Sequence, residues 1–364
     1  MKFNEKESRA ISLVQAVGIS SVVLGHFYFQ PFDVLHPYVF HMPLFFFLGG
    51  LLLSIKKSLP KKILSIIQKH GGYLVKSYII TGLLSLILVY YFSVEERKPF
   101  DDGIISTIKL VIKSNFGNNG LFVVGWFLLA YIIANALCAI LVSIDKGGVA
   151  GKVFIAFFAI LSFYFGMYYL PALYVDRSHY IINISAQVST ASAFMLTGYL
   201  AKNYLFKLLR LDVMVILVLA MIAVKNLGYQ KGVNIAWTGY PSGIIISIIT
   251  SLSAIYILFT ICSAAASLKG TNPLIIYIAK NTKSIMTYHI FSFYLVDLFF
   301  YTIGVYDIKK TATYSHYKNI ETWPIYILCG ITLPLAMVLI YDVTIKKINL
   351  NKKLKFFSPP PSDS

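Results

Sequence analysis

Two histidines lie near each other in the sequence, each at one end of an apolar run. His26 closes the run Val-Val-Leu-Gly-His-Phe, and His41 opens the run Phe-His-Met-Pro-Leu-Phe-Phe-Phe-Leu-Gly-Gly. If the two runs form antiparallel helices, the short connection between them brings both imidazoles to a similar depth. An imidazole takes or gives a proton near neutral pH, which suits the activation of a hydroxyl group. The alternative is that both are interfacial histidines hydrogen-bonded to water or to backbone carbonyls.

A third histidine and a carboxylate lie in a later apolar run. Ionisable side chains are costly inside a membrane, so each is a candidate functional residue. His289 follows Lys283 by a distance of roughly 9 Å along a helix, and with Lys283 at the cytoplasmic boundary we expect His289 on the opposite side from His26. A helix-packing hydrogen bond is the alternative for His289. Asp297 must be paired, protonated or water-facing, and its sequence neighbours do not decide among these.

Apolar runs long enough to cross a bilayer recur along almost the whole chain. Hydrophobic residues make up 57% of the sequence and charged residues 13%, whereas a soluble domain carries about 25% charged residues. Unpaired backbone groups in lipid exclude isolated strands, so each run should be a helix. The predicted fold class is therefore all-α: a polytopic transmembrane helix bundle with about ten transmembrane helices, at residues 10–29, 39–55, 73–93, 120–144, 152–170, 182–201, 211–224, 242–264, 284–305 and 323–341.

The positive charge of the chain has a topological explanation. A net charge of +17 would suggest nucleic acid as the partner of a soluble protein. Here most Lys and Arg residues fall in alternate connections, such as residues 56–76, 202–210 and 269–283. The positive-inside rule then places both termini in the cytoplasm. We expect residues 1–345 to form one integral membrane domain and residues 346–364 to form a basic, then Pro/Ser-rich, disordered cytoplasmic tail.

The connections between the runs also carry information. Residues 94–119, 225–241 and 306–322 are long enough to cap a cavity on the external side. The Lys-rich segment 56–72 has interspersed apolar residues and is predicted to be an interfacial amphipathic helix that joins the second and third spans.

Several kinds of chemistry find no support in the sequence. No Walker loop or GxSxG motif is present, so ATP hydrolysis and soluble-hydrolase chemistry are not indicated. No metal site is expected, because the cysteines have no metal-ligand spacing; they are Cys138, Cys262 and Cys329. Transport and membrane-embedded group transfer remain as the two classes of function.

Five segments, in order along the chain, share features with one family. They are residues 13–27, which end in Gly-His-Phe, and residues 40–50, 125–129 (Gly-Trp-Phe-Leu-Leu), 196–200 and 278–289, which end in Tyr-His. In this pattern the chain resembles membrane-bound acyltransferase family 3, the O-acetyltransferases of cell-surface polysaccharides. It differs from the family pattern at Gln15, where the family has Arg, and at Gly49, where Ser is usual.

The resemblance implies transfer of an acyl group, by expectation acetyl, from cytoplasmic acetyl-CoA to a hydroxyl of a cell-surface glycan at the outer face of a bacterial cytoplasmic (inner) membrane. The acceptor would be O-antigen, capsule, exopolysaccharide or a lipid-linked glycan. The partners would be acyl-CoA, glycan and membrane lipids, without nucleic acid and without a metal. His26 would be the general base and Gln15 would position the donor. The implied substrate-binding residues are His41, Trp126, Tyr288, His289, Lys69 and Lys76.

Some of these assignments have alternatives. Gln15 can donate hydrogen bonds but supplies no charge, so Arg9, Lys69 or Lys76 are candidates to replace the family's arginine. Trp126 lies near the end of a run and also fits an ordinary aromatic-belt residue. For the whole protein, a transporter or flippase and a polymerase of lipid-linked glycan are the competing functions.

Overall fold

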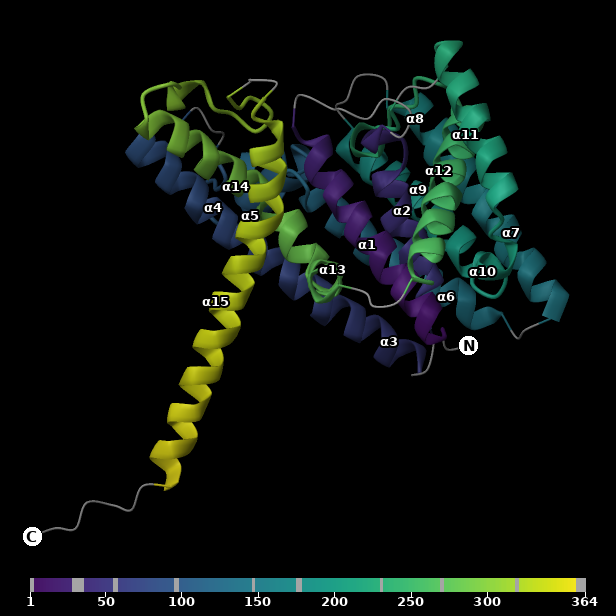
Figure 1. The fold of residues 1–364 in the computed structure, drawn as a ribbon, viewed down its shortest axis with the longest axis horizontal. Helices are drawn as coiled ribbons and strands as arrows, with labels where there is room; N and C mark the ends of the chain where they lie inside the picture. The colour runs from purple at the N-terminus through teal and green to yellow at the C-terminus, as the bar shows by residue number, and fades with distance from the viewer. Residues whose placement is uncertain are drawn as a thin grey trace, which may run out of the picture.

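The structure is a computed structural model that describes residues 3–27, 36–54, 58–94, 98–145, 148–174, 179–229, 232–268, 272–317 and 321–357. Within these residues the regular elements are helices, and none is a β-strand. The all-α fold class is therefore confirmed. Figure 1 shows α1, α2 and α9 in the middle of the bundle, with α14 and α15 to one side and α7 and α11 to the other.

The described helices have the following bounds: α1 Glu5–Gly25, α2 Pro37–Leu51, α3 Leu59–Ile66, α4 Gly72–Phe92, α5 Ile104–Lys113, α6 Gly125–Ile144, α7 Gly148–Tyr164, α8 Leu170–Leu173, α9 Tyr180–Ala201, α10 Leu205–Leu208, α11 Leu211–Asn226, α12 Ile244–Ala265, α13 Pro273–Lys280, α14 Thr282–Thr302 and α15 Trp323–Phe357. Helix α15 continues past residue 346, the predicted start of the tail. Residues 358–364 lie outside the described part of the chain.

Six described helical segments are long and apolar enough to cross a membrane, by length and composition: Glu5–Gly25, Leu59–Phe92, Gly120–Ile144, Gly148–Leu173, Ile244–Ala265 and Trp323–Thr344. The other predicted runs are also helical and correspond to α2, α9, α11 and α14, which are shorter or more polar. The number ten and the orientation of the termini therefore stay predictions.

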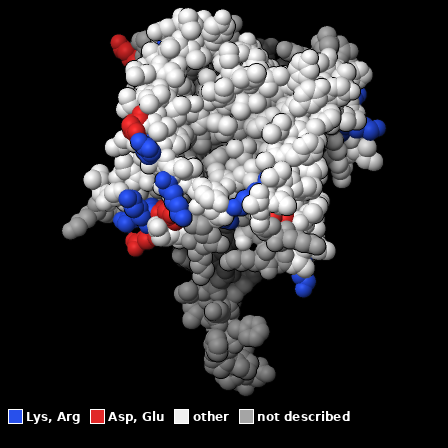
Figure 2. Space-filling model, turned by 90° about the vertical axis from the view of Figure 1, so that its right-hand side faces the viewer, with Lys and Arg blue, Asp and Glu red and all other residues white. Residues whose placement is uncertain are grey.

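The outer surface of the bundle is mostly uncharged. Figure 2 shows one face on which uncharged side chains cover a broad area, and most of its Lys and Arg side chains lie in the lower half. Helices α7 and α11 contribute large exposed apolar side chains, among them Val153, Phe157, Ile160, Ile216 and Leu219. A monomeric soluble protein rarely exposes apolar patches of this kind, whereas lipid covers them at no cost.

Glycines allow the central helices to approach closely. A Cβ atom on Gly50 of α2 would lie 1.7 Å from the carbonyl oxygen of Met195 in α9, and one on Gly198 of α9 would lie 2.0 Å from the carbonyl oxygen of Phe47. The two backbones therefore touch, as small residues permit between membrane helices. Helix α1 packs against α2, α12, α13 and α14. The helix that carries Gln15 and His26 is thus surrounded by other helices.

The segment predicted to be a separate interfacial helix is part of one long helix. Residues Leu59–Phe92 are continuous through α3, a π-helical turn at Ile67–Gly71, and α4. The amphipathic helix predicted for residues 56–72 is thus present over Leu59–Ile66 but runs without interruption into the third span, and its interfacial position stays a prediction. A π-helical turn inserts an extra residue into the helix and is frequent at functional sites. Here it contains His70.

Helices α13 and α14 meet at a break in the helical structure at Asn281. Asn281 ends α13 and starts α14, and both helices pack against α1. Lys283, in the first turn of α14, is partly buried within the bundle. Lys283 was expected at the cytoplasmic boundary; the structure shows it partly buried, with α13 before it in the chain, and its depth in the membrane stays a prediction.

Candidate functional site

Two of the cavities along α1 are lined by ionisable side chains. The first, which we call the His26 cavity, has a volume of about 310 Å³ and is lined by His26, Tyr38, His41, Trp126, Trp237 and Tyr314, among other residues. The second, the Lys283 cavity, has a volume of about 160 Å³ and is lined by Gln15, His70, Tyr131, Thr282 and Lys283, with apolar residues between them. Gln15 and His26 are separated by roughly 16 Å of helix.

The protonation of two imidazoles is fixed by backbone carbonyls. In His41 the Nδ1 atom donates a hydrogen bond to the carbonyl oxygen of Pro37. In His289 the Nδ1 atom donates to the carbonyl oxygens of Met286 at 2.9 Å and Ile285 at 3.1 Å. A neutral imidazole that carries its proton on Nδ1 has a lone pair on Nε2. Both rings therefore present a basic Nε2 atom, and each is held in one orientation by its own helix.

His26 and His289 are neighbours. Their ring centroids are 4.9 Å apart, and the Nδ1 atom of His26 and the Nε2 atom of His289 are buried without a hydrogen-bond partner among the described residues. The expectation that these histidines lie on opposite sides was wrong. Because α14 starts inside the bundle, the rise from Lys283 brings His289 level with the end of α1. Unsatisfied buried nitrogens are rare in folded proteins and indicate a site for a polar ligand.

The loop before α12 forms one wall of the His26 cavity. Val233, Asn234 and the 3₁₀ turn Ile235–Trp237 line the cavity. The carbonyl oxygen of Ala236 accepts hydrogen bonds from three buried amides, those of Asn115 at 2.8 Å, Asn183 at 3.1 Å and Gln187 at 2.7 Å. A carbonyl bonded by three donors from two other parts of the chain is held rigidly. The loop is thus a fixed wall of the cavity.

A buried aspartate holds the opposite wall. Asp297 of α14 has no exposed surface, and its carboxylate accepts hydrogen bonds from the hydroxyls of Tyr326 at 2.5 Å and Thr311 at 3.1 Å, His316 Nδ1 at 2.7 Å and the Tyr317 amide at 3.0 Å. Three of these four donors belong to the segment 311–317. Of the alternatives left open by the sequence, Asp297 is therefore paired. It cannot accept more donors without losing one of these.

The segment that Asp297 holds brings an aromatic ring onto His26. Ala312 and Ser315 form a tight antiparallel bridge, and Tyr314 at the tip of this turn stacks on His26 with a ring-centroid distance of 5.9 Å and an angle of 12°. Tyr314 is 58% exposed, so one face of the ring lies on the histidine while the phenol reaches the cavity. The Asp297 carboxylate therefore positions the Tyr314 ring through the turn.

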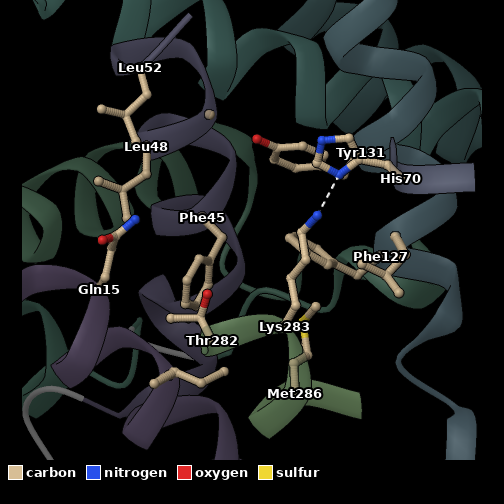
Figure 3. Close-up of a pocket in the computed structure, with 13 residues that line it drawn as sticks. Gln15, Phe45, Leu48, Leu52, His70, Phe127, Tyr131, Thr282, Lys283 and Met286 are labelled. Carbon is tan, nitrogen blue, oxygen red and sulfur yellow. Dashed lines mark hydrogen bonds between the residues drawn. The ribbon is translucent and has the colours of Figure 1, made fainter. Parts of the chain in front are cut away.

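The Lys283 cavity has a different character. Lys283 Nζ donates a hydrogen bond to His70 Nδ1 at 2.8 Å, which Figure 3 shows across the cavity from Gln15. The His70 ring lies 5.6 Å from the ring of Tyr131. Gln15 is partly buried, and its side chain makes no hydrogen bond with a described residue. The cavity therefore combines a cation and a free amide with mostly apolar walls.

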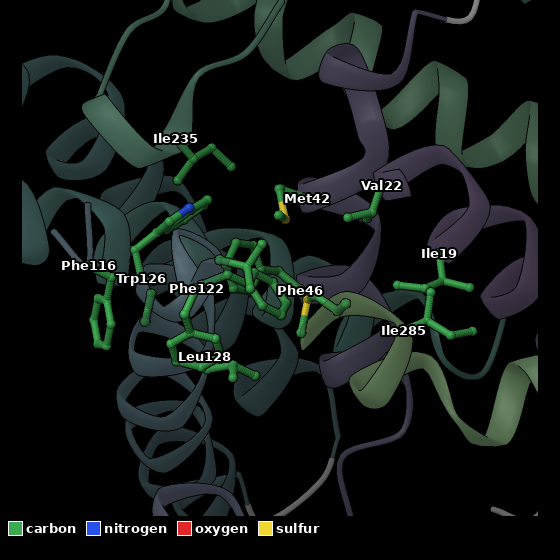
Figure 4. Packing of buried hydrophobic residues seen from close by; sticks show 14 of the residues in the cluster. Ile19, Val22, Met42, Phe46, Phe116, Phe122, Trp126, Leu128, Ile235 and Ile285 are labelled. Atoms are coloured by element: carbon green, nitrogen blue, oxygen red, sulfur yellow. The ribbon is translucent and has the colours of Figure 1, made fainter. Parts of the chain in front are cut away.

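An apolar layer separates the two cavities. Ile19, Phe127 and Met286 line the Lys283 cavity, and Met42 and Trp126 line the His26 cavity. All of them belong to one buried cluster that is filled by Phe46, which has no exposed surface. Figure 4 shows Phe46 among Met42, Val22 and Ile19. Any group that passes between the cavities must displace part of this layer.

The structure places the predicted site residues in several locations. His26, His41 and Trp126 line one cavity, and Gln15 lines the other. Tyr288 lies against Tyr73 and Ser77 of α4, and lines neither cavity. Lys69 and Lys76 are exposed; the ammonium of Lys76 lies 5.1 Å from the centre of the Tyr341 ring. Neither lysine, nor Arg9, lines either cavity.

Several residues of the site were not recognised in the sequence: His70, Tyr314, His316 and the amides of Asn115, Asn183 and Gln187. His70 and His316 fall in segments taken as connections, and polar residues in connections carry no signal that they are buried. The three amides lie in two different regions of the chain and converge only through the fold. The length of the connections 225–241 and 306–322 was the signal available, and their described residues do line the His26 cavity.

Comparison with protein families identifies one match. The family model described as an acyltransferase domain, of acyltransferase family 3, covers residues 8–342, which is nearly the whole chain. The matched region contains both cavities and every residue named above as lining them. Comparisons with curated proteins and with solved structures give no match.

Proposed function

The chain belongs to acyltransferase family 3, and on this premise we propose that it transfers an acetyl group from acetyl-CoA to a hydroxyl of a cell-surface glycan. It is a multi-pass membrane protein and an acyltransferase. The observation that carries the proposal is the pair of neighbouring imidazoles His26 and His289, each with a buried nitrogen that has no partner among the described residues; of the two, His26 lines the cavity with aromatic walls.

His26 acts as the general base on the acceptor. It takes the proton of the sugar hydroxyl while the hydroxyl oxygen attacks the carbonyl carbon of the thioester. The new C–O bond of the ester forms, the C–S bond breaks, and His26 returns its proton to the sulfur of CoA. A positioned base of this kind contributes typically 10²- to 10⁴-fold to the rate.

The other imidazoles support His26. His289 lies 4.9 Å from His26 between ring centroids and presents an unprotonated Nε2 atom, which orients the His26 ring or stabilises its protonated form. His41 presents its own Nε2 atom from α2, in the same cavity. Both are positioning residues, because their Nδ1 protons are committed to carbonyls of their own helices.

Aromatic side chains favour a sugar as the acceptor. Tyr38, Trp126, Trp237 and Tyr314 come from four different parts of the chain and line the same cavity. A tyrosine or tryptophan offers an apolar face together with a polar edge, and a sugar ring has the matching combination of C–H faces and hydroxyls. A cavity for a purely apolar acceptor would not need the polar edges or the imidazoles.

The presence of two cavities is compatible with the approach of the two substrates from two sides of the membrane. The acceptor reaches the His26 cavity from the outer face of a bacterial cytoplasmic membrane, where O-antigen, capsule and exopolysaccharide are exposed. Acetyl-CoA comes from the cytoplasm, where the positive-inside rule places the Lys-rich connections. It enters from the side of the Lys283 cavity, and no metal is needed for the reaction as written.

The test is acyl transfer by the purified protein in proteoliposomes. Labelled acetyl-CoA is supplied together with cell-surface glycan, and the expected product carries an ester label that mild alkali removes. A transporter or a polymerase of lipid-linked glycan would give no ester label. Label transferred at the wild-type rate by the His26→Ala protein would overturn the assignment of the base.

A further inference from the structure

The Lys283 cavity contains a positive charge without a negative one. Among the described residues that line it, Lys283 is the only Lys or Arg, and none is Asp or Glu. No described carboxylate forms an ion pair with Lys283. Most of the other lining residues are apolar, among them Ile19, Leu48 and Phe127. An ammonium group held among apolar side chains of a membrane protein is costly and marks a functional site by default.

The neighbours of Lys283 hold the ammonium in place but leave its charge uncompensated. His70 Nδ1 accepts a hydrogen bond from Lys283 Nζ at 2.8 Å, and it can do so only when the imidazole is neutral. The ring of Tyr73 lies 5.5 Å from the same ammonium, close enough for a cation–π contact. Both partners are neutral, so the cavity keeps a net positive charge.

The local backbone adds to this charge. Helix α14 begins at Thr282, directly after the break at Asn281, and Thr282 and Lys283 both line the cavity. The first N–H groups of a helix carry a partial positive charge. Broken membrane helices commonly direct such an end at an anionic part of a substrate. The π-helical turn in the neighbouring helix places His70 against this start.

We propose that Lys283 binds a phosphate group of the acyl donor, whose uncharged arm then extends along the apolar walls towards His26. This inference rests on the proposed function. Lys283 lies six residues, roughly 9 Å or about 1.7 helical turns, before His289, so it is too far from His26 to contact the reacting carbonyl. Gln15 lines the same cavity from α1, and its side chain donates hydrogen bonds to the donor there.

The proposal also accounts for the neutral residue at Gln15. A positive charge was expected on Arg9, Lys69 or Lys76 to compensate for it, but none of these lines the cavity. Lys283 lines the same cavity as Gln15 from a different helix. The charge that α1 lacks is therefore supplied by α14.

The first experiment compares two donors that differ in their phosphates. Lys283→Met should lower kcat/KM for acetyl-CoA by about 10- to 100-fold, the range of a lost charge-assisted contact. The value for S-acetylpantetheine, which has no phosphate, should change by less than about twofold on the same scale. Lys280→Met is the matched control, because Lys280 is exposed and lines neither cavity. Equal losses of kcat/KM for both donors would overturn the proposal, and so would an unchanged kcat/KM for both. The unchanged values are expected if Lys283 instead binds the headgroup of a phospholipid.

The second experiment moves the charge to the other side of the cavity. Gln15→Arg in the Lys283→Met background should recover about tenfold or more of the lost kcat/KM for acetyl-CoA. A double variant that folds but shows no recovery contradicts binding by charge.

Binding of CoA, measured at equilibrium on the purified protein, separates this proposal from the proposed function. If the wild-type protein transfers acetyl groups and the Lys283→Met protein binds CoA as tightly as the wild type, the role of Lys283 is refuted and the proposed function is not. If the wild-type protein binds CoA but transfers no acetyl group, and the Lys283→Met protein does not bind CoA, the role of Lys283 in binding is supported and the proposed function is refuted.

Discussion

The two cavities along α1 differ in how their polar groups are held. In the His26 cavity, backbone carbonyls fix the tautomers of His41 and His289, and the two loop walls are tied down by the Ala236 carbonyl and by Asp297. In the Lys283 cavity the main polar group is a lysine with a long, flexible stem, held by a hydrogen bond to His70.

This difference matches two different chemical tasks. Proton transfer requires a base at a fixed distance from the reacting hydroxyl, and a rigid site provides it without further reorganisation. Binding a charged group that must enter and leave at every turnover is better served by a side chain that adapts. Under the proposed function, reaction takes place at the rigid end and substrate exchange at the adaptable end.

Substitution of the base should give the largest effect. His26→Ala should lower acyl transfer by about 10²- to 10⁴-fold, the usual contribution of a general base, and leave equilibrium binding of CoA unchanged. His179→Ala, at the exposed start of α9, is the control. Reduced CoA binding in His26→Ala would break the separation of the two cavities.

Removal of the aspartate should come next. Asp297→Ala takes away the acceptor of four donors, and loss of a partner in a buried charged pair costs about 3–5 kcal/mol of unfolding free energy. We expect a lower midpoint of thermal unfolding and a higher KM for the glycan. Asp297→Asn, which keeps the volume, should be milder. A folded Asp297→Ala protein with an unchanged KM for the glycan would show that the turn 311–317 has no part in acceptor binding.

The stacked tyrosine should have a smaller and more selective effect. Tyr314→Ala should raise KM for the glycan by about 2- to 10-fold, which corresponds to the loss of one aromatic stacking contact of about 0.5–1.5 kcal/mol. Tyr314→Phe keeps the ring and should resemble the wild type. The KM for acetyl-CoA should be the same in the wild type, Tyr314→Ala and Tyr314→Phe. A changed KM for acetyl-CoA would contradict the assignment of donor and acceptor to separate cavities.

One amide that holds the loop wall should give the smallest effect. Gln187→Leu removes one of three donors to the Ala236 carbonyl, and two remain. The expected loss is about 0.5–1.5 kcal/mol of unfolding free energy, measured by chemical or thermal denaturation in detergent. A loss of more than twice this range would mean that the loop depends on Gln187 alone.

The helical runs could be predicted from the sequence because membrane thickness fixes their length. Each of the ten predicted runs falls on a described helix. The break at Asn281, where α14 begins, could not be predicted. A lysine and polar neighbours in the sequence are equally compatible with a membrane boundary and with a break between two helices. For the same reason the depth of His289 was wrong. The continuity of α3 with α4 was missed because a Lys-rich amphipathic segment also fits an interfacial helix.

The candidate site was predicted in part. His26, His41, Trp126 and Gln15 line the two cavities, because residues that are polar within apolar runs are conspicuous. Residues in connections were missed, because their burial depends on contacts between distant parts of the chain. His316 meets Asp297 only because the segment 311–317 folds back onto α14. No local sequence pattern predicts that this segment packs against α14.

The apolar layer around Phe46 has a consequence for the cell that houses the protein. A membrane enzyme with a polar chamber open to each side would let protons and small ions leak through it, unless a water-free constriction stays shut between the chambers. Met42 and Met286 lie on opposite faces of this layer, and methionine side chains bend to fit irregular shapes. The narrow pantetheine arm of the donor could pass between these side chains while they stay packed around it. The layer would then block ion flow, and the membrane potential would be maintained during each turnover.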